Sequence, residues 1–115
     1  MRLHHLALRV ADVERALGFY NGVLGLTEIK RHHADGRLRS IWLSAGDVVL
    51  MIELALRGRP AGAGSGHLLC FAVDDLGAWE ARLTAAGVDV EDRTTSTLYV
   101  SDPDGHRVGL SVYVF

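Results

Sequence analysis

The chain has 115 residues, of which 49% are hydrophobic and 23% charged, and its formal net charge is −2. This length predicts one domain, or two small halves that share a core, and the composition excludes a disordered chain. The apolar runs are far shorter than the ~20 residues that span a bilayer. No basic run gives the electrostatic footprint of a nucleic-acid-binding protein. We therefore expect a small-molecule partner, with no nucleic acid and no membrane.

The beginning of the chain and its cysteine content bear on the compartment. Residues 1–10 enter a strand pattern directly, with no apolar signal segment before it. The single cysteine, Cys70, cannot form an internal disulfide, which fits a reducing compartment. Both features predict a cytoplasmic protein.

The first elements are a strand and a helix. Residues 3–10 alternate in polarity, which predicts a strand with two different faces. His5, Ala7 and Arg9 share one of these faces. Asp12 is a suitable helix N-cap, and apolar residues then recur at helical spacing over 13–24 until Gly25. The pattern predicts one helix that ends at this glycine.

Three more strands complete the first half of the chain. The predicted ranges are 26–33, 37–44 and 48–54. Asp35-Gly36 has the residues of a hairpin turn, and a second tight turn is expected at 45–47. In the last strand Met51 and Glu53 share a face. The order is strand, helix and three strands.

The second half repeats this order after a segment rich in glycine and small residues, 55–66. A strand is predicted at 66–73, a helix between Asp75 and Gly87, and strands at 88–91, 96–101 and 107–115. Residues 102–105 have Pro and Gly at the positions that a tight turn requires. The prediction is an α+β chain of two tandem βαβββ modules, 1–54 and 67–115, joined by the linker 55–66. Each module would form a curled mixed sheet, and the two sheets would surround a cavity.

Three motifs resemble one known family. They are HLALRVAD with FYNGVLGL in the first module, FAVDDL in the second module, and the closing DPDGHR. These motifs and the duplication are similar to the vicinal oxygen chelate superfamily, which includes glyoxalases, extradiol dioxygenases, epimerases, fosfomycin-resistance transferases and bleomycin-binding proteins. The resemblance covers essentially the whole chain. It implies the fold more than the function, because this fold supports several unrelated chemistries.

The resemblance also implies positions for a metal site. Metal-dependent members carry ligands on the first and last strand of each module, which here fall on His5 and Glu53 in the first module. In the second they fall on Leu68 and Gly109, where metal enzymes of the family usually have His and Glu. A catalytic divalent metal needs at least three protein ligands. His67 lies beside Leu68, but an unforced strand register directs it to the opposite face, toward the helix.

Two interpretations of His5 and Glu53 stay open at this point. They could be part of a metal site that substrate, water or a partner chain completes, or a hydrogen-bonded polar pair in a ligand pocket. The rest of the predicted cavity face is mostly small or apolar, Met51 included, and Arg9 and Arg107 add groups suited to an anion. Ligand contacts are therefore predicted at His5, Arg9, Met51, Glu53 and Arg107.

Two functions follow from these features. The first is a glyoxalase- or bleomycin-resistance-like protein that binds a small organic molecule in the cavity, with an incomplete metal site. The alternative is a metal-dependent lyase, epimerase or dioxygenase acting on a substrate with vicinal oxygens, in which Glu53 would move a proton. Either protein is expected to be a homodimer. Whether the chain is an enzyme is left open, and so is the identity of any divalent cofactor.

Overall fold

The computed structural model of the chain describes residues 1–55 and 66–115. The predicted linker, 55–66, therefore falls outside the described residues except at its two ends. The chain divides into a first unit, Met1–Ala61, and a second unit, Gly62–Phe115. Among the described residues, no helix is both long and apolar enough to cross a membrane.

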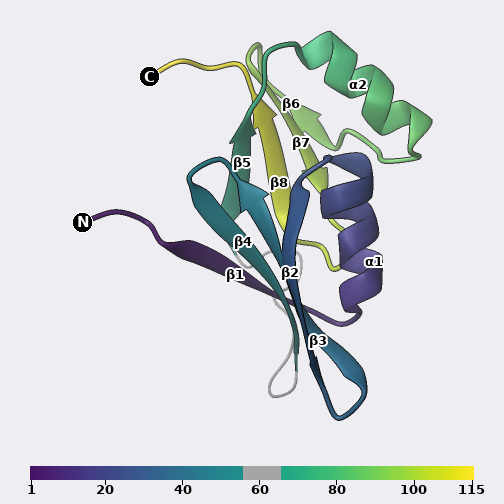
Figure 1. Cartoon of the computed structure of the whole chain (residues 1–115). Coiled ribbons are helices and arrows are strands. Elements are labelled where there is room, and N and C mark those ends of the chain that lie inside the picture. Colours follow the sequence, from purple (N-terminus) through teal and green to yellow (C-terminus); the bar gives the residue numbers. More distant parts are fainter. Residues whose placement is uncertain (56–65) are drawn as a thin grey trace. The chain divides into compact units, whose positions relative to one another are not determined.

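The first unit contains one mixed sheet with the strand order β1-β4-β3-β2 (Figure 1). β1 and β4 are parallel neighbours, while β4 with β3 and β3 with β2 are antiparallel. The strands are β1 (His5–Val10), β2 (Thr27–Ala34), β3 (Arg37–Ala45) and β4 (Val48–Leu54).

The second unit has the equivalent order, β5-β8-β7-β6, with β5 and β8 parallel. Its strands are β5 (Leu68–Ala72), β6 (Asp92–Arg93), β7 (Thr97–Ser101) and β8 (Arg107–Ser111), and its helix is α2 (Leu76–Ala85). The predicted α+β class and the two tandem βαβββ modules are confirmed. The cavity that the modules were predicted to surround stays a prediction.

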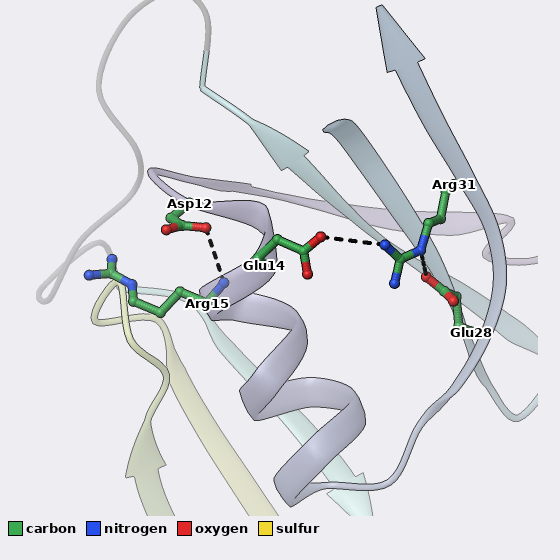
Figure 2. Close-up of polar contacts among 5 residues, drawn as sticks. All are labelled: Asp12, Glu14, Arg15, Glu28 and Arg31. Atoms are coloured by element: carbon green, nitrogen blue, oxygen red, sulfur yellow. Dashed lines mark hydrogen bonds and ion pairs between the residues drawn. The ribbon is translucent and has the colours of Figure 1, made fainter. Parts of the chain in front are cut away.

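The first helical segment is less regular than predicted. It begins as α1 (Val13–Leu17) and continues as a π-helical segment, η1 (Gly18–Val23). The carboxylate of Asp12 accepts a hydrogen bond from the backbone N–H of Arg15 at 3.1 Å, so the predicted N-cap is present (Figure 2). Gly25 has φ +78°, and the next backbone N–H donates to the carbonyl of Tyr20 at 3.0 Å. That bond closes the end of the π-helical segment, and Gly25 supplies the left-handed conformation that this ending uses.

One face of each sheet is buried. In the first unit, alternate residues of β1, β3 and β4 are at most 4% exposed, and apolar residues of α1 and η1 are buried with them. Burying such side chains stabilises a fold by roughly 1.5–3 kcal/mol each. The buried set of the first unit is Leu8, Val10, Val13, Ala16, Phe19, Tyr20, Leu24, Ile41, Leu43, Leu50 and Ile52. In the second unit it is Leu83, Leu98, Val100, Val108 and Leu110.

A charged network joins α1 to β2 at the surface of the first unit (Figure 2). The guanidinium of Arg31 contacts Glu28 on its own strand at 2.5 Å and Glu14 of α1 at 3.4 Å. Glu14 is 63% exposed, so solvent screens the second contact. Such surface pairs contribute at most about 1 kcal/mol, and the buried apolar face is the main source of stability.

Two strand predictions in the second unit are wrong. The strand predicted at 88–91 is instead β6, Asp92–Arg93. Gly87 has φ +73° and the N–H of Val88 donates to Leu83 at 2.9 Å, so these residues terminate α2 instead of starting a strand. The strand predicted at 107–115 ends at Ser111, and beyond it Tyr113 donates its N–H to the Ser111 hydroxyl at 3.1 Å.

The predicted tight turn at 102–105 is confirmed. The N–H of Gly105 donates to the carbonyl of Asp102 at 3.0 Å, and Gly105 has φ +87°. The Asp102 carboxylate, 5% exposed, also accepts backbone N–H bonds from Asp104 and His106. The turn thus holds the start of β8 in place through main-chain hydrogen bonds.

Candidate functional site

The face of the first sheet opposite its buried side carries most of the predicted site, and we call it the first open face. Strand register divides this face into rows of neighbouring residues. The three rows are His5–Val49–Ser44–Thr27, Ala7–Met51–Trp42–Lys30 and Arg9–Glu53–Ser40–His32. The predicted ligand contacts His5, Arg9, Met51 and Glu53 all lie here.

His5 and Glu53 are on this face but not side by side. His5 lies opposite Val49, and Glu53 lies opposite Arg9, four residues further along. Four residues of strand correspond to about 13 Å. The Nδ1 atom of His5 instead lies 2.8 Å from Nδ1 of His4. Among the described contacts there is no His5–Glu53 hydrogen bond, so the structure gives no support to the polar-pair interpretation.

The side chains of the described residues that could ligate a metal are not grouped into a metal site. Among residues 1–55 and 66–115, no group of three or more His, Cys, Asp or Glu side chains is arranged to hold a metal ion. In the first unit the two candidate ligands, His5 and Glu53, are separated by their register. A divalent catalytic metal needs at least three protein ligands, so these two residues by themselves fall short of one.

Trp42 is the centre of the first open face. It lies within β3, between Met51 and Lys30 in its row. The Lys30 ammonium lies 5.2 Å from the centre of the indole ring. The indole N–H is buried and has no hydrogen-bond partner among the described residues. An unsatisfied buried donor costs roughly 1–3 kcal/mol, so an acceptor that reached it would bind favourably.

The corresponding face of the second sheet, the second open face, is more apolar. Its rows are Leu68–Arg107–Ser101, Cys70–Gly109–Tyr99–Asp92 and Ala72–Ser111–Thr97. Leu68, where metal enzymes of the resembled family carry a histidine, is 45% exposed. The same face has no carboxylate on β8.

The register also refines which residue of the second unit corresponds to Glu53. Glu53 lies opposite Arg9, and the duplication of the chain matches Arg9 with Ala72. Ser111 lies opposite Ala72, so by register it is the counterpart of Glu53, two residues beyond Gly109. Both Gly109 and Ser111 lack a carboxylate.

Gly109 allows Cys70 to occupy the centre of the second open face. A Cβ atom at Gly109 would lie 2.9 Å from the Cys70 sulfur, closer than carbon and sulfur pack. Partial burial raises the pKa of the Cys70 thiol above its usual value, so the thiol stays protonated at neutral pH. The structure therefore gives this cysteine no sign of nucleophilic activation.

Arg107 is the cationic group of the second open face. Its guanidinium carbon lies 4.8 Å from the centre of the Tyr99 ring, and one of its nitrogens lies 3.6 Å from the Asp92 carboxylate. Its side chain is 45% exposed. Sequence reasoning identified Arg107 as a candidate contact residue, but it did not identify Tyr99 and Asp92 as its neighbours. Strand register places these two residues beside Arg107.

His67 does not reach the second open face. Its Nε2 atom lies 3.3 Å from Nδ1 of His106. His106 is 2% exposed and precedes β8 by one residue, so it alternates with Arg107 and shares the side of the buried Val108. His67 therefore belongs to the helix side of the sheet.

A hollow that sequence reasoning missed lies in the first unit, beside the start of α1. It has a volume of about 320 Å³ and is open to solvent. Both acidic and basic groups border it, with apolar side chains between them. Its lining residues are Ala11, Asp12, Val13, Glu14, Arg37, Leu38 and Leu54. No spacing pattern in the sequence indicates it, because its residues come from three separate segments.

Comparison with known proteins gives one consistent family. Residues 2–110 match the model of the glyoxalase/bleomycin resistance protein/dioxygenase superfamily. A lactoylglutathione lyase of Neisseria meningitidis is 32% identical over an alignment covering 94% of this chain and 88% of that protein. The glutathione transferase FosA of Serratia marcescens is 31% identical, with 96% and 79% covered.

Solved structures show the same fold. The crystal structure of TnmS3, an antibiotic-binding protein from Streptomyces sp. CB03234, has a TM-score of 0.76 to this chain. It is 24% identical, and the match covers 96% of this chain and 94% of that one. At this level of identity the likeness concerns the fold.

Proposed function

The chain belongs to the glyoxalase/bleomycin resistance protein/dioxygenase superfamily, and on this premise we propose that it binds a small, partly apolar organic molecule on the open faces of its sheets. His5, Arg9, Met51, Glu53 and Arg107 are the proposed contact residues. One open face presents a tryptophan, and the other presents a leucine, a cysteine and a tyrosine. Apolar surface with a few polar groups is what small-molecule sites use.

The observation that carries the proposal is the indole N–H of Trp42, which has no hydrogen-bond partner within residues 1–55 and 66–115. The open faces combine it with cations held over aromatic rings, Lys30 over Trp42 and Arg107 over Tyr99. A donor that a fold leaves buried and unused is unfavourable in the free protein. A ligand that brings a carbonyl, hydroxyl or carboxylate oxygen to this donor would remove that cost.

The test uses 2-naphthamide, a neutral aromatic amide, and reads the two indole N–H signals of the protein by NMR. The chain has two tryptophans, so the variants Trp42→Phe and Trp79→Phe assign the signals. We expect a saturable shift of the Trp42 signal, because it acquires an acceptor, and a constant Trp79 signal. Equal behaviour of both signals would contradict the proposal.

The predicted polar centre has its own test with the same probe. His5→Ala and Glu53→Ala should each weaken binding of 2-naphthamide by about threefold or more if they contact the ligand, since a hydrogen bond contributes ~0.5–1.5 kcal/mol. Unchanged affinity in both variants would remove His5 and Glu53 from the site while leaving binding at Trp42 intact.

A second candidate function is a metal-dependent enzyme acting on vicinal oxygens. The presence of His5 and Glu53 on one face favours it, and the curated relatives are named as a lyase and a transferase. A catalytic metal would require further ligands than these two. We therefore rank this function second, with Glu53 as the proton-transferring residue it would use.

A further inference from the structure

Arg107 is held in a defined position on the second open face. Tyr99 lies opposite Gly109 in the register, two residues beyond Arg107, so the guanidinium extends diagonally across the tyrosine ring. The distance of 4.8 Å between guanidinium carbon and ring centre is within the range of a cation–π contact. A cation–π contact of this kind uses none of the N–H donors of the guanidinium.

Asp92 holds the same guanidinium only loosely. It lies opposite Tyr99 on β6, and its carboxylate oxygen is 3.6 Å from a guanidinium nitrogen of Arg107. Charge-assisted hydrogen bonds of this kind measure about 2.7–2.9 Å, so this is an ion pair without a close hydrogen bond. Both side chains are well exposed, 45% and 67%. The pair is therefore weak, and an incoming anion could replace Asp92.

The neighbours of Arg107 across the sheet are apolar. Leu68 lies directly opposite it on β5 and is 45% exposed, and Cys70 follows on the same face. The exposed leucine offers contact to an apolar group of a ligand. The guanidinium beside it offers paired hydrogen-bond donors to an anionic group. The two features are about one strand spacing apart, ~5 Å, which is within the length of one aromatic acid.

We propose that the second open face binds a planar organic anion, an aromatic carboxylate or a chemically similar acid. This inference rests on the proposed function and specifies its ligand class. The anionic group forms paired hydrogen bonds with Arg107, and the aromatic body lies against Leu68 and Cys70. Tyr99 is a positioning residue for the guanidinium, and Asp92 competes with the ligand for it.

The experiment compares 2-naphthoate with 2-naphthamide, which have the same shape and differ in charge. Both are titrated into the full-length protein, and both affinities are read from the backbone amide signals of Leu68, Cys70 and Tyr99 on the second open face. We expect 2-naphthoate to bind about tenfold more tightly, because hydrogen bonds to charged groups contribute ~1.5–3 kcal/mol. Arg107→Gln should abolish this preference, so that 2-naphthoate binds no more tightly than 2-naphthamide does.

A matched control is available in α2. The guanidinium carbon of Arg82 lies 5.0 Å from the centre of the Trp79 ring, in the same kind of contact but away from the open face. Arg82→Gln removes one positive charge, as Arg107→Gln does, and should leave both affinities unchanged. If both variants weakened 2-naphthoate binding equally, the preference for the anion would come from the net charge of the protein and not from Arg107. That result would overturn the inference.

Three further variants test the roles of the neighbours. Asp92→Asn removes the competing charge, so 2-naphthoate should bind two- to fivefold more tightly while 2-naphthamide is unaffected. Tyr99→Leu frees the guanidinium and should weaken 2-naphthoate, whereas Tyr99→Phe keeps the ring and should restore the affinity. A loss in Tyr99→Phe equal to that in Tyr99→Leu would contradict the positioning role.

The outcomes separate this inference from the function on which it rests. If 2-naphthamide binds at Trp42 but 2-naphthoate binds no more tightly, the inference is wrong and the proposed function stands. If neither compound saturates the protein, both fail. Near-ultraviolet circular dichroism of each variant verifies that the fold is intact, so a lost affinity reports the contact removed.

Discussion

Gly109 shows how one missing side chain determines the chemistry available on the second open face. The sequence motif placed a metal enzyme's carboxylate at this position, and the register moves that place to Ser111. At Gly109 itself a Cβ atom would lie 2.9 Å from the sulfur of Cys70. The next contacts, with the Cys70 Cβ and the Thr97 methyl, would be ordinary at 3.5 Å. The glycine and the cysteine are therefore packed as a pair, and a side chain at 109 requires the sulfur to move.

Gly109→Ala should lower the free energy of unfolding by about 1–2 kcal/mol, the usual cost of overpacking a methyl group. The cost should disappear in the Cys70→Ala background, because only the sulfur is too close. Urea unfolding of the single and double variants measures both values. An undiminished cost in the double variant would show that the strain lies elsewhere than at Cys70.

The helices begin in the same way in both units, and both beginnings are readable from local sequence. Asp12 and Asp75 each accept a backbone N–H bond at 3.1 Å from the residue three positions later. A capping carboxylate also interacts favourably with the positive end of the helix. Such an interaction involves only four consecutive residues, so local sequence can indicate it.

Asp75→Ala should destabilise the protein by about 1 kcal/mol through the loss of the α2 cap. Asp75→Asn should recover most of this loss, because an amide oxygen also accepts the hydrogen bond. Asp74→Ala is the matched control, since Asp74 is adjacent, exposed and not the cap residue. Thermal unfolding checks the three variants, and an equal effect of Asp74→Ala would refute the capping argument.

Across the whole chain, two units with equivalent strand order have unequal chemical groups. The first open face has His5, Glu53 and Arg9, and the second has Leu68, Gly109, Ser111 and Arg107. A duplicated fold therefore need not preserve a duplicated site. The first face offers hydrogen bonds and charge, while the second offers apolar contact and one cation.

We expect the purified, untagged protein to show no saturable uptake of nickel, manganese, iron(II) or zinc below micromolar concentration. The physical reason is that two separated ligands bind a divalent ion weakly. Isothermal titration of the intact chain measures this, with size-exclusion chromatography to test the proposed homodimer. Stoichiometric uptake that is lost in His5→Ala would favour the metal-dependent enzyme over the binding protein.

Sequence alone determined the class of fold, the two modules, the helix cap at Asp12 and the turn at 102–105. These features depend on side-chain period and on neighbours a few residues apart, which a single chain displays directly. The same period placed His5 and Glu53 on one face and Arg107 on the equivalent face of the other unit. The same period predicted the wrong position for β6. The backbone N–H of Val88 donates to the carbonyl of Leu83, so Val88 belongs to the end of α2 and not to a strand.

Only the tertiary structure decided which of these residues are neighbours. The alternation of side chains along a strand specifies the face on which a residue lies. It does not specify which residue of the neighbouring strand lies opposite it. Pairing Glu53 with Arg9 separates it from His5, and pairing Tyr99 with Gly109 brings its ring under Arg107. These offsets are set by hydrogen bonds between strands far apart in the sequence, so the geometry of the site follows from the packing of the sheet.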